Sequence, residues 1–132
     1  MASAFAHLNV TTAYSAHFGV SWPEELVEVA AADGAHILGR TDRDGLYGMA
    51  KHLKACLAHN IAPVVGVSLA VMWDPTATVE GEPLPAGRVT ILALSAAEAG
   101  YGQANNLGAG YQALVRLISL AHTQLGSDQR PY

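Results

Sequence analysis

Hydrophobic residues recur along the chain at two spacings, one typical of strands and one typical of helices. Four short apolar runs predict strands at residues 5–10, 36–40, 62–72 and 88–95. Three longer stretches, in which apolar residues return every three or four positions, predict helices at about residues 22–33, 46–59 and 111–125. Strands that alternate with helices indicate an α/β fold with a mostly parallel sheet.

Polar and small residues mark where the predicted helices begin and end. Ser21 is the predicted N-cap of the first helix, with proline in the first turn and Glu24 three residues after the cap. Gly34, Asn60 and Gly126 are the predicted terminators of the three helices. The segment 73–87 contains three prolines and two glycines and predicts a loop, as does 96–106. We expect one domain over 1–132, with its core at 5–123 and a frayed tail at 127–132.

Composition narrows the possible classes of function. The chain has 132 residues, of which 51% are hydrophobic and 14% charged, so it is more apolar than an average domain. This excess favours a homodimer or higher homo-oligomer that buries an additional apolar face. The net charge is −4 and the seven basic residues are scattered, which argues against autonomous nucleic-acid binding.

The single cysteine and the N-terminal sequence indicate the compartment. Cys56 stands alone, which excludes an internal disulfide and a cysteine zinc cluster, and its apolar helical context predicts a buried, inert thiol. The first residues lack the features of a signal peptide, and no apolar run approaches the ~18 residues of a membrane span. We therefore expect a cytoplasmic protein without a membrane partner.

Three motifs occur in a fixed order: His7-Leu8-Asn9-Val10-Thr11, Thr41-Asp42-Arg43-Asp44-Gly45-Leu46-Tyr47-Gly48, and Val65-Gly66-Val67-Ser68. Together with segments 22–27 and 110–122, they resemble the PHP (polymerase and histidinol phosphatase) domain of bacterial DNA polymerase III alpha subunits, most closely the error-prone type. The family motifs read roughly L-H-x-H-S, T-D-H-D-G-L-Y-G and V-G-x-E. The resemblance implies a distorted TIM-type barrel, here truncated to about four mostly parallel strands and three main helices.

The resemblance also implies that the metal centre has been lost. Asn9, Thr11, Arg43 and Ser68 stand where the family has histidine or glutamate ligands, and only Asp42 survives. Asparagine, threonine and serine are poor ligands for zinc or manganese. We therefore expect no metal and no cofactor. A truncated barrel exposes a sheet edge and an apolar flank. Either the last helix folds back over them or a second copy packs there, and we favour the second copy.

Alternation along the strands suggests how the remaining polar residues are arranged. Alternate residues share a face, so Arg40 and Asp42 point the same way on the second predicted strand. By resemblance, the face that carries Asn9, Thr11, Asp42 and Ser68 is the barrel interior. The expected result is a polar pocket with two groups of candidates. The catalytic candidates are Asp42, Arg40 and His7, and the ligand-binding candidates are Asn9, Thr11, Tyr14, His17, Trp22, Arg43 and Ser68.

Two functions fit this expected pocket. The first is binding of a small organic molecule, with metal-free acid/base catalysis of a cyclisation or isomerisation type in which Asp42 accepts a proton. The second is a non-catalytic interaction or scaffold module derived from a polymerase PHP domain, in which Arg40 and Asp42 form a structural plug. The sequence leaves open whether the chain is an enzyme, and it disfavours a residual metal phosphoesterase.

Overall fold

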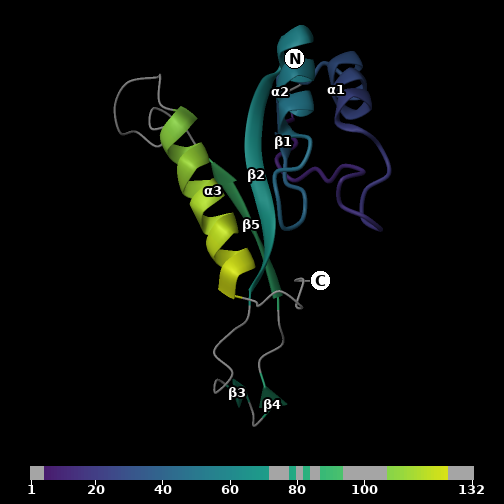
Figure 1. Ribbon diagram of the computed structural model, residues 1–132. Coiled ribbons are helices and arrows are strands. Elements are labelled where there is room, and N and C mark those ends of the chain that lie inside the picture. The colour runs from purple at the N-terminus through teal and green to yellow at the C-terminus, as the bar shows by residue number, and fades with distance from the viewer. Residues whose placement is uncertain (1–4, 72–77, 80–81, 84–86, 94–106, 125–132) are drawn as a thin grey trace.

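The computed structural model describes residues 5–71, 78–79, 82–83, 87–93 and 107–124. Its elements, in chain order, are α1 (Pro23–Ala32), β1 (Ile37–Arg40), α2 (Met49–Ala58), β2 (Ala62–Val71), β3 (Thr78–Val79), β4 (Glu82–Pro83), β5 (Gly87–Ala93) and α3 (Leu107–Gln124). The main sheet has the order β1-β2-β5, and β3 pairs only with β4 (Figure 1). The α/β class is confirmed; the barrel is not tested by these three strands.

The strand directions correct the expectation of a mostly parallel sheet. β1 runs parallel to β2, with Arg40 opposite Val65, as a β-α-β unit requires. β5 instead runs antiparallel to β2, with Ser68 opposite Thr90. The reason is the connection: no helix was predicted between β2 and β5, and two strands joined without a crossover helix pair as a hairpin. The predicted loop 73–87 carries the small β3–β4 ribbon near the tip of this hairpin.

The first predicted strand, residues 5–10, does not form a regular strand. It lies beside β1, where His7 and Leu38 form an isolated parallel bridge. Two backbone bonds hold it: Gly39 N–H donates to the His7 carbonyl (2.6 Å) and Thr41 N–H to the Val10 carbonyl (2.9 Å). A Cβ on Gly39 would lie 2.8 Å from Leu8 Cα, so glycine permits this close approach.

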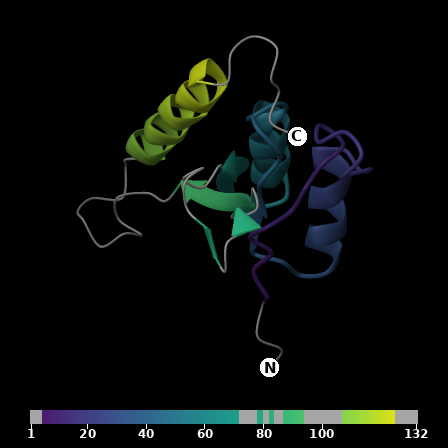
Figure 2. The ribbon, with the colours of Figure 1, turned by 90° about the horizontal axis from the view of Figure 1, so that it is seen from below.

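The three helices lie on one face of the sheet (Figure 2). α3 and α2 cover β2 and β5 through Leu114 and Met49, which pack on Val65, Val67 and Leu69. α1 packs beside α2. A second cluster joins these two helices to β1 through Val27, Cys56, Leu38 and Ile61. The predicted burial of Cys56 is confirmed, since its side chain is 0% exposed.

Two of the predicted helix terminators are confirmed, whereas the predicted N-cap of the first helix is wrong. Gly34 follows α1 with φ +79° and Asn60 follows α2 with φ +54°, both in the left-handed conformation that ends helices. The predicted N-cap Ser21 is wrong by one residue. Trp22 occupies that position, and its backbone N–H donates to Glu25 Oε2 (2.9 Å), so the glutamate three residues on caps the helix.

The remaining sequence predictions fall partly outside the described residues. These are the ends of the third and fourth strands at Met72 and Ser95, the loop 96–106, the terminator Gly126 and the tail 127–132. α3 begins at Leu107, four residues before the predicted start. Within the described parts of the chain, the structure has no helix long and apolar enough to cross a bilayer.

Candidate functional site

Arg40 and Asp42 form a buried ion pair where β1 ends. Each side chain is 1% exposed, and Arg40 Nε donates to Asp42 Oδ2. The two residues lie on the same side of the extended backbone, because they are two positions apart. The sequence-based expectation that these two residues come together is therefore met by the geometry.

The Asp42 carboxylate is saturated by hydrogen bonds from the loop that precedes α1. Oδ1 accepts from the Thr12 N–H and from Ser15 Oγ, and Oδ2 accepts from Thr12 Oγ1, each at 2.7 Å. With Arg40, this gives four donors to one carboxylate, which matches its acceptor capacity. Thr12 and Ser15 were not among the predicted site residues. Their signal in the sequence is weak, because a threonine and a serine in a turn are ordinary.

The Arg40 guanidinium lies beside an aromatic ring, and its charge acts on a buried histidine. Its Cζ lies 5.4 Å from the centroid of the Tyr14 ring, in cation–π range. Among the described residues, Nη1 and Nη2 have no hydrogen-bond partner although both atoms are buried. His52 of α2 is 2% exposed, and burial, together with the positive charge of Arg40, lowers its pKa to about 4. His52 is therefore a neutral neighbour of the pair at physiological pH.

The predicted shared face is wrong in one respect: Asp42 and Ser68 lie on opposite faces of the sheet. The β1–β2 register continues past β1, so that Arg43 and Ser68 form a bridge, with Ser68 N–H donating to the Asp42 carbonyl (3.0 Å). Arg40 and Asp42 consequently share the helix-covered face with Val65 and Val67. Side chains that are one residue apart on a strand point to opposite faces of the sheet. The prediction therefore placed the Asp42 side chain on the wrong face.

The other predicted site residues do not surround Asp42. Asn9 is exposed and its Oδ1 accepts from Thr41 Oγ1 (2.6 Å). Arg43 stacks its guanidinium on Phe18, with Cζ 3.6 Å from the ring centroid. His7 and His17 are exposed, Thr11 is half-buried, and Trp22 is 49% exposed against Tyr14. The structure thus brings Arg40 and Asp42 together with Tyr14, against which Trp22 packs, and it pairs Arg43 with Ser68 on the opposite face of the sheet.

The residues at the family's ligand positions do not fit a metal centre. Asn9, Thr11, Arg43 and Ser68 offer no imidazole or carboxylate, and Arg43 brings a positive charge. Across the ranges that the structure describes, no three His, Cys, Asp or Glu side chains converge as metal ligands would. These four positions therefore do not supply the imidazole and carboxylate donors of a zinc or manganese site.

A second arginine, which the sequence analysis did not single out, holds Ser68. Arg88 of β5 donates from Nη2 to the Ser68 carbonyl and to Asp44 Oδ1, each at 2.6 Å, and from Nε to Ser68 Oγ at 3.2 Å. The Arg88–Asp44 pair is about four-fifths buried. Arg88 therefore ties β5, β2 and the turn after β1 together, at the position where the family has glutamate.

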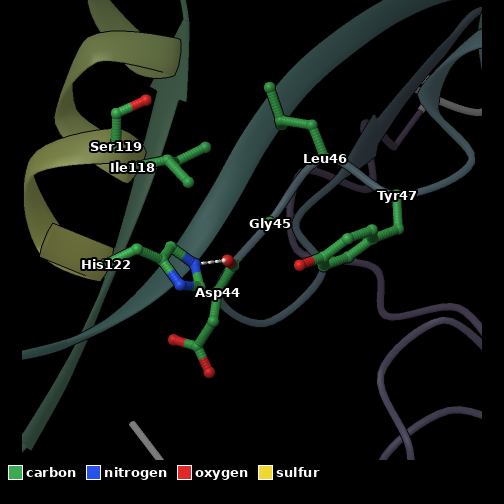
Figure 3. A pocket seen from close by; sticks show the side chains of 7 residues that line it. All are labelled: Asp44, Gly45, Leu46, Tyr47, Ile118, Ser119 and His122. Atoms are coloured by element: carbon green, nitrogen blue, oxygen red, sulfur yellow. Dashed lines mark hydrogen bonds between the residues drawn. The ribbon is translucent and has the colours of Figure 1, made fainter. Parts of the chain in front are cut away.

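An open pocket of about 360 Å³ lies between α3 and residues 44–47 of the turn that follows β1. His122 reaches from α3 to the turn, where its Nε2 lies 2.6 Å from the Asp44 carbonyl and donates to it (Figure 3). Tyr47 approaches the same space from the opposite side. A Cβ on Gly45 would lie 2.3 Å from the Tyr47 ring, so glycine lets the ring pack on the turn. Leu46, Ile118 and Ser119 complete the lining.

Comparison with known proteins finds one family model and several polymerases that are similar to this chain. The family model "PHP domain" matches residues 7–132. The error-prone DNA polymerase of Mycobacterium tuberculosis H37Rv is 34% identical over 97% of this chain, and DNA polymerase III subunit alpha of Bacillus subtilis is 30% identical over 96%. The chain spans about 10% of the length of each of these polymerases.

A solved structure agrees on the fold. An amidohydrolase from Chromobacterium violaceum superimposes with a TM-score of 0.55 at 24% identity, covering 92% of this chain and 37% of the amidohydrolase. At this identity the likeness concerns the fold alone. The match to the family model over nearly the whole chain, with the ordered motifs and the α/β fold, shows that this chain belongs to the PHP domain family.

Proposed function

We propose that this chain is a non-catalytic PHP module, which serves as an interaction or scaffold domain of the kind found in DNA polymerase III alpha-type proteins. The observation that carries the proposal is the closed Arg40–Asp42 pair. A carboxylate that acts as a base needs access to a substrate proton. Asp42 is 1% exposed, and four intramolecular donors already occupy it.

The second support is electrostatic. Metal ions supply positive charge to a PHP centre, and here two guanidinium groups stand beside the corresponding motifs. Arg40 compensates Asp42 on the helix-covered face, and Arg88 compensates Asp44 next to Ser68. Buried charges are tolerated when they are paired and hydrogen-bonded. We therefore propose that the two arginines keep the fold intact without a metal.

The proposal predicts that the chain does not hydrolyse phosphodiesters. The test is hydrolysis of bis-p-nitrophenyl phosphate with Mn²⁺, with Zn²⁺ and with EDTA, with Asp42→Asn as the matched variant. We expect rates at the level of buffer in every case. Metal-dependent hydrolysis that falls in the Asp42→Asn variant would overturn the proposal.

The partner of such a module is also a proposal. Large apolar side chains are exposed on α1 and α2, where Val29 is 68% exposed and Leu57 is 76% exposed. A second copy of the chain is the simplest cover for these helices. Light scattering after size exclusion should give twice the mass of the chain (13.8 kDa), and Leu57→Glu should lower it to the monomer value. A monomer at all concentrations would exclude the homodimer and leave other polypeptides as the partner.

A second candidate function is binding of a small organic ligand in the pocket between the turn and α3. Its volume of about 360 Å³ is in the range of ligand sites, and it combines the apolar Leu46 and Ile118 with Tyr47 and His122. Ligand binding there should be sensitive to Ile118→Trp, which fills the space, and insensitive to Arg40→Met, which lies on the other side of the turn.

A further inference from the structure

The start of α1 forms a pocket whose lining has the chemistry of an organic-cation site. This open pocket of about 350 Å³ is lined by Trp22, Glu24, Glu25 and Lys51. An indole face attracts cations through its quadrupole, and carboxylates strengthen that attraction. This pocket shares no residue with the Arg40–Asp42 pair or with the pocket against α3.

The aromatic wall is held in place from behind. The Tyr14 ring meets the Trp22 ring edge-on, with centroids 5.4 Å apart at 78°. Tyr14 in turn packs on Gly48, where an added Cβ would lie 2.1 Å from the ring, and against the guanidinium of Arg40. Trp22 nevertheless keeps 49% of its surface exposed. A supported but exposed indole is typical of a recognition surface.

The chain already places one of its own cations in this pocket. Lys51 Nζ lies 5.8 Å from the centroid of the Trp22 ring and 3.9 Å from Glu24 Oε1. Both partners of the ion pair are about half exposed, so water screens it and Lys51 can be displaced. Glu25 uses Oε2 to cap the helix. The ammonium group of Lys51 thus marks the position at which a cation of higher affinity would bind.

We propose that this pocket binds a guanidinium or ammonium group that displaces Lys51. A guanidinium fits best, because its planar fork stacks on an aromatic face and pairs with carboxylates, which a lysine does less well. The group comes either from a free small cation or from an arginine on a polypeptide partner. This inference does not depend on the proposed non-catalytic function, because a catalytic domain could carry the same pocket.

The experiment is a nuclear magnetic resonance titration of the Trp22 indole N–H, assigned with a Trp22→Phe variant. The probe is N-acetyl-L-argininamide at constant ionic strength. We expect a saturable shift, a dissociation constant at least threefold lower in Lys51→Ala, and a constant unchanged in Lys54→Ala, an exposed lysine of the same helix that does not line the pocket. Glu24→Gln with Glu25→Gln, which keeps a capping oxygen, should weaken binding at least tenfold.

Two further outcomes separate the sources, and one overturns the proposal. A peptide with a central arginine that binds at least tenfold more tightly than the free amide identifies a polypeptide partner. Equal affinity identifies a small free cation. A shift that grows linearly without saturation, and is the same in the unaltered chain and in Lys51→Ala, would overturn the proposal.

Discussion

Arg40 Nε donates to the carboxylate of Asp42 in a pair whose side chains are each 1% exposed. The pair lies on the helix-covered face of the sheet, opposite the face that carries Ser68. Asp42 has three further donors from Thr12 and Ser15, whereas two nitrogens of Arg40 have none among the described residues. The carboxylate is therefore the centre of the network and the arginine is its less satisfied partner.

This asymmetry predicts unequal costs for breaking the pair. Asp42→Ala leaves a buried guanidinium and three donors without an acceptor, and should lower the free energy of unfolding by about 3–5 kcal/mol. Arg40→Met leaves a carboxylate that still accepts three hydrogen bonds, so its cost should be smaller. Urea unfolding of both variants measures the difference. A larger loss in Arg40→Met would contradict the central role of Asp42.

His52 predicts how stability depends on pH. Its pKa is about 4 in the folded state and about 6.5 in the unfolded chain, because burial and Arg40 disfavour the charged form. Between these values the unfolded state binds the extra proton, so stability falls as the pH decreases from about 6.5 to 4 and is fully present above that window. The contribution of this one group is on the order of 3 kcal/mol.

The matched pair of variants for this prediction is His52→Gln and His59→Gln. Glutamine at 52 keeps a side-chain donor near the Leu38 carbonyl but does not titrate, so the acid-induced loss should become shallower. The exposed His59 at the end of α2 should behave like the unaltered chain. Urea unfolding at several pH values distinguishes them, and equal slopes in all three proteins would exclude His52 as the cause.

Cys56 predicts slow thiol chemistry. Its side chain is 0% exposed, and burial raises the pKa of the thiol to about 11, so little thiolate forms at neutral pH. The reaction with a disulfide reagent should proceed only as fast as the chain opens, and should become immediate in denaturant. Rapid labelling of the folded protein would show that the cluster of Val27, Leu38, Cys56 and Ile61 opens readily.

We expect the loss of Arg88 to lower the free energy of unfolding more than the loss of an exposed ion pair does. Arg88→Met removes the bonds to Ser68 and Asp44, which are mostly buried, and should lower the free energy of unfolding by about 1–3 kcal/mol. Lys51→Met removes the exposed pair with Glu24 and should cost less than about 1 kcal/mol. Thermal or urea unfolding of the two variants provides the comparison, and similar losses would contradict the role of Arg88 as a clamp.

The sequence predicted the positions of the helices better than it predicted how the strands pair and which face of the sheet a side chain occupies. Periodicity located the three helices, and the ordered motifs identified the family, because both signals are local. The direction of β5 and the face of Asp42 depend on strand pairing, which is set by contacts far apart in the chain. The same reason explains why Thr12, Ser15 and Arg88 were missed. Each gains its role only when a distant residue folds against it.

The central claim is that paired arginines, and no bound metal, hold this PHP domain together. The most direct measurement is the free energy of unfolding of the chain in EDTA and in 100 µM Mn²⁺ or Zn²⁺. The account predicts the same value in all three solutions. A site with a dissociation constant of 1 µM would instead raise the free energy of unfolding by about 2.7 kcal/mol at this concentration, and such a rise would contradict it.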